Sequence, residues 1–266
     1  MVSVMASDTF FDGLNPTQLD AVTHSSGPLL IVAGAGSGKT RVLTHRIAHL
    51  IKNLGVSPYE ILAITFTNKA ASEMKERVGA LVGPVAENMW VSTFHSACVK
   101  ILRREGAALG YPSSFTIYDQ ADAIRLTTYV MRDLNMDTKQ YPPRGVHSAI
   151  SKAKNELISP KAFEQNAETY ADEQVAQIFH EYQNRLLKSA AMDFDDLLCK
   201  TVEVFKKAPE TLERYQNRFQ HILVDEYQDT NPVQNELVIQ LSSKNRNVCV
   251  VGDPVSYTHL TLPTKA

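Results

Sequence analysis

A glycine-rich run that ends in lysine and threonine is the stretch of this sequence whose residue types and spacing point most directly to chemistry. The run, Gly34-Ala35-Gly36-Ser37-Gly38-Lys39-Thr40, follows the apolar segment 29–32 and precedes a helical pattern. A glycine-rich turn before a helix N-terminus directs backbone N–H groups and the positive end of the helix dipole at an anion. In such a loop the lysine contacts the β- and γ-phosphates, and the threonine hydroxyl ligates Mg²⁺. We therefore predict a nucleotide site at Lys39 and Thr40.

The strict pattern for such a loop has glycine at the position of Ala33. Alanine is compatible with this position if its backbone is extended, because the later glycines supply the unusual dihedral angles. A glycine-rich turn with a merely solvated Lys39 is the alternative interpretation. The apolar segment before the loop and the helical pattern after it favour the nucleotide site.

Two adjacent acids, Asp225 and Glu226, end the apolar segment that begins at residue 221. Acidic pairs are common, and this one could simply end a strand in solvent. Downstream of a phosphate loop, at the carboxyl end of a predicted strand, it is the expected second element of a nucleotide site. Asp225 would hold Mg²⁺ through water, and Glu226 would orient and polarise the attacking water as general base.

Two further residues each allow two interpretations. Gln18 is the third residue of a helix that Asn15 caps, so it could complete a capping box or bind the edge of an adenine. Phe194 lies between Asp193 and Asp195, where it could anchor the core or, if exposed, stack on a base. The residues alone leave both alternatives open.

Buried strands that alternate with helices must position these residues. Strands are predicted at residues 29–32, 61–66, 89–93, 221–226 and 248–253, and a helix follows each of the first three. Three strand–helix units in a row indicate a parallel sheet with helices on its faces. The carboxyl ends of such strands bind ligands in open α/β sheets, and Phe66 and Asn68 come at one of these ends.

The composition is that of an ordinary globular protein, with 266 residues, 44% of them hydrophobic and 21% charged. A net charge of −2 gives no global basic signal, so any nucleic-acid contact must come from local patches. The three cysteines argue against a disulfide framework or a zinc site and fit a reducing cytoplasm. Apolar runs fall short of the roughly 18 residues that cross a membrane. Residues 1–9 lack the features of a signal peptide.

Several motifs occur in an order that is more specific than any one of them. They are Asn15–Gln18, Ala33–Thr40, Thr65–Ala71, Ser92–Ser96, Asp193–Asp196 and Asp225–Asn231. With these motifs, residues 14–253 resemble the N-terminal portion of the UvrD/Rep/PcrA family of superfamily 1 DNA helicases, and most closely the PcrA type. The resemblance implies an ATP- and Mg²⁺-dependent motor that moves 3′→5′ on single-stranded DNA and acts at duplex junctions.

The resemblance also implies roles for individual residues. Gln18 would recognise adenine, Arg41 would stack beside the base, and Gln228 would sense the γ-phosphate. ATP would bind to Ala33, Gly34, Ala35, Gly36, Ser37, Gly38, Lys39 and Thr40; Mg²⁺ to Thr40 and Asp225; and Lys39, Asp225, Glu226 and Gln228 would be catalytic. Single-stranded DNA would contact Phe66, Asn68, His95 and Phe194, which suits the sequence tolerance of aromatic stacking.

The fold that the resemblance implies is a P-loop, RecA-like α/β lobe with helices on both faces of its sheet and an inserted all-helical subdomain. Residues 1–110 and 190–253 would form the ATP-binding lobe, 111–189 the helical insertion and 254–266 a non-native tail. No strand is predicted between residue 111 and about residue 220, and the helix of the Phe194 motif is predicted to include Met192. Cations of the insertion could touch phosphates or form a solvated face: Lys152, Lys154, Lys161, Arg185 and Lys188.

The sequence departs from the family after Gly252-Asp253. The family continues with a glutamine that contacts the γ-phosphate and an aromatic residue that covers the adenine, and residues 254–266 do not keep that spacing. The second motor lobe, with the arginines that complete the ATP site, is expected to lie outside these residues. We therefore expect the 266 residues alone to have at most weak ATPase activity and no unwinding activity.

Two other hypotheses fit many of the same residues. One is the helicase lobe of a nuclease-coupled recombination enzyme, and the other is a non-catalytic module that binds ATP and single-stranded DNA. DNA binding by the non-catalytic module would be insensitive to Glu226→Gln, whereas a helicase would lose turnover and keep ATP binding. A GTPase is disfavoured because Asn68–Ala71 lacks the aspartate that recognises guanine.

Overall fold

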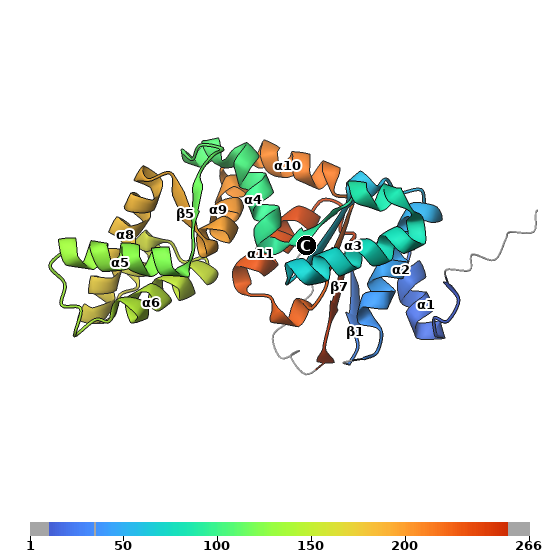
Figure 1. Ribbon diagram of the computed structural model, residues 1–266, viewed down its shortest axis with the longest axis horizontal. Coiled ribbons are helices and arrows are strands. Elements are labelled where there is room, and N and C mark those ends of the chain that lie inside the picture. Colours follow the sequence, from blue (N-terminus) through green and yellow to red (C-terminus); the bar gives the residue numbers. More distant parts are fainter. Residues whose placement is uncertain (1–10, 35, 255–266) are drawn as a thin grey trace, which may run out of the picture. The chain divides into compact units, whose positions relative to one another are not determined.

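The structure is a computed structural model, and it describes residues 11–34 and 36–254. The predictions for Ala35 and for the tail at 255–266 lie outside the described residues. The chain divides into two compact units, whose elements are labelled in Figure 1. Of the described residues, the first unit contains those from 11 to 94, Glu213–Thr230 and those from 238 to 254, and the second contains His95–Leu212 and Asn231–Leu237.

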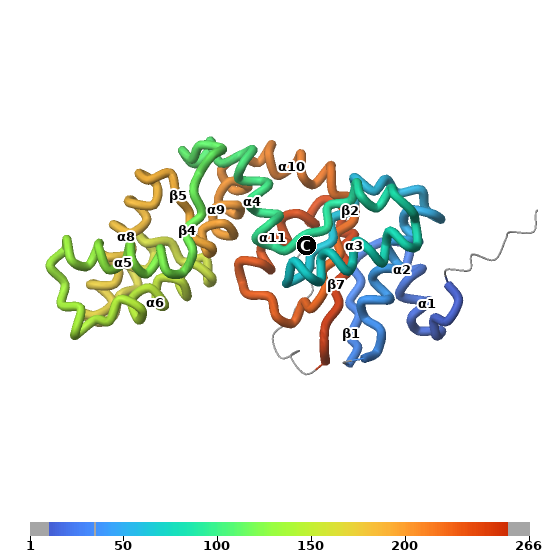
Figure 2. Tube along the Cα trace, viewed as in Figure 1, coloured from blue at the N-terminus to red at the C-terminus, as the bar shows by residue number. Residues whose placement is uncertain are grey.

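A five-stranded parallel sheet is the framework of the first unit within the described residues. Its strands are β1 (Leu29–Val32), β2 (Ile61–Thr65), β3 (Trp90–Thr93), β6 (His221–Val224) and β7 (Val248–Gly252), in the order β1-β7-β6-β2-β3. Figure 2 shows β1 in blue beside β7 in red, although the two strands come from opposite ends of the chain. The predicted parallel sheet is confirmed.

Helices α1 (Pro16–Thr23), α2 (Lys39–Lys52) and α3 (Asn68–Val82) belong to the first unit. Leu43, Ile47 and Leu50 of α2 follow the spacing of one helix face, and they pack with Met74 and Val78 of α3. The same apolar cluster includes side chains of β2, β6 and β7, so α2 and α3 cover the sheet. Short 3₁₀ segments complete the unit: η2 (Pro58–Glu60), η3 (Pro84–Asn88) and η5 (Tyr227–Asp229).

The second unit is mainly helical. It contains most of α4 (Phe94–Glu105) together with η4 (Gly106–Leu109), α5 (Gln120–Asp133), α6 (Pro143–Asn155), α7 (Pro160–Gln165), α8 (Tyr170–Lys188) and α9 (Phe194–Lys207). Helices α10 (Pro209–Arg218) and α11 (Pro232–Ser242) each have residues in both units. Ile178, Phe179, Tyr182 and Leu186 of α8 follow helical spacing and are buried. Among the described residues, no helix has the length and apolar character that a bilayer crossing requires.

The prediction that no strand precedes about residue 220 after the third one was wrong. Two short strands, β4 (Thr116–Tyr118) and β5 (Ala191–Asp193), pair in parallel within the second unit. Three residues are too few to show the alternation that identifies a strand in sequence. For the same reason Met192 was wrongly predicted to be helical: α9 begins at Phe194, and Asp193 is its N-cap.

The predicted domain boundaries at residues 111 and 189 stay a prediction about domain organisation. The compact units divide the chain elsewhere, first between Phe94 and His95 and then between Leu212 and Glu213. Residues 95–110 and 190–212, predicted to belong to the α/β lobe, therefore have most of their contacts within the helical unit.

Candidate nucleotide site and nucleic-acid contacts

The carboxyl ends of β1, β6 and β7 lie at one edge of the sheet, and backbone hydrogen bonds fix the residues that follow them. The Ala33 N–H donates to the Gly252 carbonyl at 3.1 Å, which aligns the start of the glycine-rich loop with the end of β7. The Asp225 N–H donates to the Ile64 carbonyl at 3.0 Å, which aligns the acids with β2. The sheet therefore brings together the loop, the acids and Asp253, as the strand pattern predicted for the first two.

The glycine-rich loop needs its glycines for backbone reasons. Gly36 and Gly38 have φ values of +76° and +87°, which L residues with side chains rarely adopt. A Cβ on Gly38 would also lie 3.1 Å from the Nε2 atom of Gln18. Ala33 instead continues the β1–β7 ladder, so its methyl group is compatible with the loop.

Lys39 is the first residue of α2, and its side chain is only 9% exposed. Its ammonium group donates to the Asp253 carboxylate and lies 3.6 Å from the Glu226 carboxylate. Burial lowers the pKa of Lys39, but the hydrogen bond to Asp253 and the two negative charges outweigh it, so this pKa lies above its ordinary value. The ammonium is therefore charged at neutral pH and paired with these two carboxylates.

The two acids differ in their surroundings. Asp225 is 6% exposed, and burial together with the charge of Glu226 raises its pKa. Glu226 has a left-handed backbone, with φ of 48°, and its carboxylate accepts a hydrogen bond of 2.7 Å from the Gln228 amide. The Gln228 side-chain oxygen accepts from the Asp253 N–H at 3.1 Å, so Gln228 joins Glu226 to the end of β7.

A cavity of about 230 Å³ opens beside these acids within the first unit. Thr40, Asp225 and Glu226 line it together with Phe66. A hydroxyl and a carboxylate are hard oxygen donors, and Mg²⁺ uses few protein ligands and completes its shell with phosphate oxygens and water. The described residues contain no group of three or more His, Cys, Asp or Glu side chains that could hold a metal ion. The donor pair of Thr40 and Asp225 fits Mg²⁺ bound with a nucleotide.

Gln18 forms the capping box that the sequence allowed and also reaches the loop. Its side-chain oxygen accepts from the Asn15 N–H at 3.0 Å, while Asn15 accepts from the Gln18 N–H at 2.8 Å. The Gln18 amide nitrogen donates to the Ser37 carbonyl at 3.0 Å. Arg41 is exposed and donates to the Asp12 carbonyl at 3.0 Å. Adenine recognition by Gln18 and stacking by Arg41 stay predictions.

The residues predicted to contact DNA fall into two pairs. Phe66 and Asn68 belong to the first unit, where the Phe66 ring meets the buried Phe94 ring edge-on at 5.9 Å. His95 and Phe194 belong to the second unit, and their rings also meet edge-on, with centroids 5.9 Å apart. Phe194 is 49% exposed, so of its two interpretations the core anchor is wrong and a surface contact stays open.

Two residues near these sites differ from what the sequence pattern indicated. Lys154, counted among the cations that could touch phosphates, is 4% exposed and pairs with Asp193 and Asp196 at 2.7 and 3.0 Å. Asp253, the partner of Lys39, was not predicted as a site residue. Its position at the carboxyl end of a predicted strand, at the same edge as the loop, was the available signal.

A comparison with known protein families matches residues 14–255 to the UvrD/REP helicase N-terminal domain. The chain belongs to this family. The predicted family is thus confirmed, and the parallel sheet flanked by helices is the α/β architecture expected of a RecA-like motor domain.

Curated relatives carry the name ATP-dependent DNA helicase PcrA. The protein of that name from Bacillus subtilis (strain 168) is 51% identical over 93% of this chain, and the one from Staphylococcus aureus (strain Mu50 / ATCC 700699) is 53% identical over 90%. A third, from Leuconostoc citreum, is 50% identical over 94%. The chain spans 33% of the length of each of these relatives.

Proposed function

We propose that this chain is the ATP-binding N-terminal part of an ATP-dependent DNA helicase that moves 3′→5′ on single-stranded DNA. One observation carries the proposal. Lys39, at the start of α2, is held between the carboxylates of Asp253 and Glu226, beside the cavity that Thr40 and Asp225 line. A buried cation, a general base and a metal-ligand pair at one sheet edge are the components that phosphoryl transfer from ATP requires.

In this proposal Lys39 exchanges its carboxylate partners for the β- and γ-phosphates of ATP. Thr40 and Asp225 hold Mg²⁺, which supplies charge neutralisation on the phosphate oxygens. Glu226 accepts a proton from water as the water oxygen bonds to the γ-phosphorus and the β–γ bridging bond breaks, giving ADP and phosphate. Gln228 orients the Glu226 carboxylate through their 2.7 Å hydrogen bond and couples it to Asp253.

Single-stranded DNA is the proposed track, with Phe66, Asn68, His95 and Phe194 as its contacts. The half-exposed Phe194 and the edge-on ring pairs support contact with bases by stacking, which tolerates any sequence. Duplex junctions are the proposed substrate for unwinding, and the relatives' name supports a DNA helicase. A reducing cytoplasm is the proposed compartment, in keeping with three free cysteines.

Calorimetry with ATP and Mg²⁺ tests nucleotide binding directly. We expect the chain to bind ATP, and we expect Lys39→Ala to abolish measurable binding because the buried cation is removed. Lys52→Ala, at the other end of α2, is the matched control and should leave the affinity unchanged. Equal ATP affinity of Lys39→Ala and the unaltered chain would refute the proposal.

We also propose that these 266 residues alone hydrolyse ATP weakly and do not unwind DNA. The relatives are about three times as long, and translocation by such motors needs two lobes that close on ATP and open after hydrolysis. A stopped-time assay on a duplex with a single-stranded overhang measures this. ATP-dependent strand separation by the 266 residues alone would contradict it.

A further inference from the structure

The direction in which the Phe194 ring points depends on the first turn of α9. Phe194 is the first residue of that helix, and its ring lies at 87° to the His95 ring. Because Phe194 is half-exposed, the backbone of this first turn sets where its ring lies beside the His95 ring. The residues that hold the first turn of α9 therefore decide how the ring is presented.

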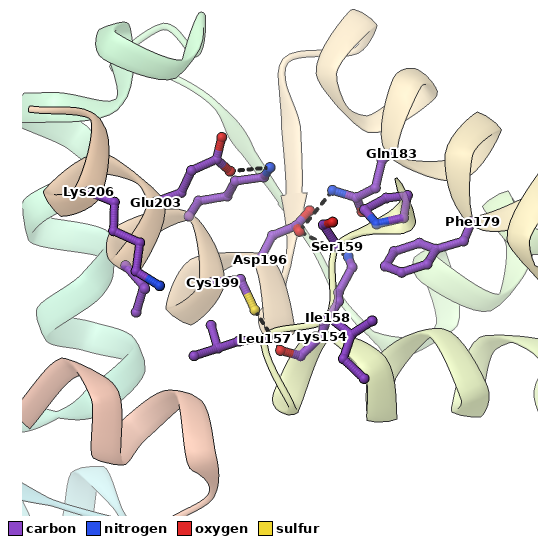
Figure 3. A pocket seen from close by; sticks show the side chains of 13 residues that line it. Lys154, Leu157, Ile158, Ser159, Phe179, Gln183, Asp196, Cys199, Glu203 and Lys206 are labelled. Carbon is purple, nitrogen blue, oxygen red and sulfur yellow. Dashed lines mark hydrogen bonds and ion pairs between the residues drawn. The ribbon is translucent and has the colours of Figure 1, made fainter. Parts of the chain in front are cut away.

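Asp193 holds this turn from the interior. As N-cap, its Oδ1 atom accepts from the Asp196 N–H at 2.8 Å, and its Oδ2 atom accepts from Lys154 and from the Tyr182 hydroxyl, both at 2.7 Å. Lys154 lies in the last turn of α6, and Figure 3 shows it with Asp196 among the side chains that line a cavity of about 270 Å³. The end of α6 is thus fixed to the start of α9.

Asn155, the last residue of α6, holds the same turn at a second point. Its amide nitrogen donates to the Asp195 carboxylate at 2.9 Å and to the Ser151 carbonyl at 2.9 Å. Its amide oxygen accepts from the Asn231 side chain at 2.6 Å. Asp195 is the residue next to Phe194, so this amide holds the side chain that directly follows the ring in the sequence.

The partner on the other side, Asn231, is itself part of a helix start. Its side-chain oxygen accepts from the Gln234 N–H at 2.9 Å, and its own N–H donates to the Gln234 side chain at 3.1 Å, so it caps α11. Asn155 therefore joins the N-termini of α9 and α11. Asparagine suits this position because it offers a donor to Asp195 and an acceptor to Asn231, whereas aspartate would face Asp195 with a like charge.

We propose that Asn155 is a positioning residue for the DNA contact, because its amide bridge between Asp195 and Asn231 holds the Phe194 ring in the orientation that meets DNA. This inference rests on the proposed function, in which Phe194 contacts single-stranded DNA. Asn155 itself contacts neither DNA nor nucleotide in this role. It acts through Phe194.

Fluorescence anisotropy with a labelled single-stranded oligothymidylate tests this with a double-mutant cycle. Phe194→Ala should weaken DNA binding about tenfold, as expected for the loss of one stacked base. Asn155→Ala should weaken it about threefold, as expected for a lost hydrogen bond. In the Phe194→Ala background, Asn155→Ala should have no further effect. An equal loss in both backgrounds, or no loss in either, would overturn the inference.

An exchange of the two partners provides a rescue. Asn155→Asp places two carboxylates face to face and should weaken DNA binding more than Asn155→Ala does. Adding Asp195→Asn restores one donor and one acceptor, so the doubly exchanged chain should recover the affinity of the unaltered chain. The two exchanges keep the size of the side chains, so a change in packing cannot explain their effect on DNA affinity. If the doubly exchanged chain does not recover the DNA affinity, the inference is overturned.

A readout without DNA separates this inference from the proposed function. In the chain alone, the nuclear Overhauser effect between the His95 and Phe194 rings should be present and should be lost in Asn155→Ala. If Phe194→Ala leaves DNA affinity unchanged, the DNA contact in the proposed function is wrong, and the ring-to-ring signal alone decides the inference. Retention of that signal in Asn155→Ala would then overturn it.

Discussion

At the carboxyl edge of the sheet, the Lys39 side chain is held by acidic side chains that follow neighbouring strands. Lys39, Glu226 and Asp253 come from three separate segments, and Gln228 joins the last two by hydrogen bonds. Glu226 keeps a left-handed backbone that only a few per cent of non-glycine residues adopt, and such strained positions cluster at functional sites. Both the backbone and the carboxylate of Glu226, the residue proposed as general base, are therefore held in a defined conformation.

Glu226→Gln tests that role, because it keeps the size of the side chain and removes its basicity. We expect ATP affinity to be retained, while turnover falls by about 10²–10⁴-fold, the usual contribution of general base catalysis. The measurement is a steady-state ATPase assay in a chain completed with its second motor lobe, with ATP affinity from calorimetry. Unchanged turnover would favour the non-catalytic binding module instead.

The partly buried His95 side chain makes the stability of the fold depend on pH. Burial lowers its pKa, and the Asp195 carboxylate partly opposes this. As the pH falls below about 6.5, the unfolded chain takes up the proton before the folded one, so the stability that neutral His95 contributes at higher pH is lost. At neutral pH the ring is uncharged and suited to stacking.

Asp195→Asn removes the charge that opposes the effect of burial. We expect the pKa of His95 to fall further in this variant, as followed by the ring C–H signals in an NMR titration. Lys152→Met, an exposed change on α6, should leave the His95 titration where it is. A His95 pKa that rises in Asp195→Asn would show that Asp195 does not act on the ring through its charge.

Helices and strands differ in how well they could be predicted from the sequence. β2 and β7 are almost wholly apolar, so the local pattern of the sequence predicted these two strands. β4 and β5 have only three residues each, and they pair although they lie far apart in the sequence. No local sequence pattern therefore predicts them. Lys154 looked like a surface cation because its partner Asp193 is 39 positions away. The local pattern of one sequence does not show which distant residues will pair in the fold.

The buried ion pair between α6 and α9 gives a stability prediction for these two helices. Lys154→Met leaves Asp193 and Asp196 buried without their cation, so the free energy of unfolding should fall by about 3–5 kcal/mol. Lys152→Met, on the exposed side of the same helix, should change it by less than about 0.5 kcal/mol. Urea denaturation followed by circular dichroism measures both. Equal stabilities of the two variants would mean that the pair contributes nothing net.

The whole molecule has little excess charge with which to attract DNA. Its net charge is −2, and cations such as Lys154 and Arg185 are already paired with acids. The proposed DNA contacts are instead mostly aromatic. The binding of single-stranded DNA should therefore depend on stacking more than on counterion release.

We expect the affinity for single-stranded oligothymidylate to fall only about three- to sevenfold between about 50 and 200 mM salt, which corresponds to one or two phosphate contacts. Fluorescence anisotropy over a salt series measures the slope. Phe194→Ala should lower affinity without changing that slope. A loss of about a thousandfold over the same range would indicate an extended basic surface and contradict this prediction.

The order β1-β7-β6-β2-β3 also has a consequence for how the chain folds during synthesis. Among the described strands β1 lies at the sheet edge with β7 as its neighbour, and the Gly27 N–H donates to the Asn247 side chain 220 positions further along. At typical elongation rates, roughly 10–40 s pass between the emergence of these two segments from the ribosome. Until then the apolar segment 29–32 lacks the strand that pairs with it and aligns the glycine-rich loop. Ribosome-stalled chains that end before residue 248 should therefore show no amide protection in β1.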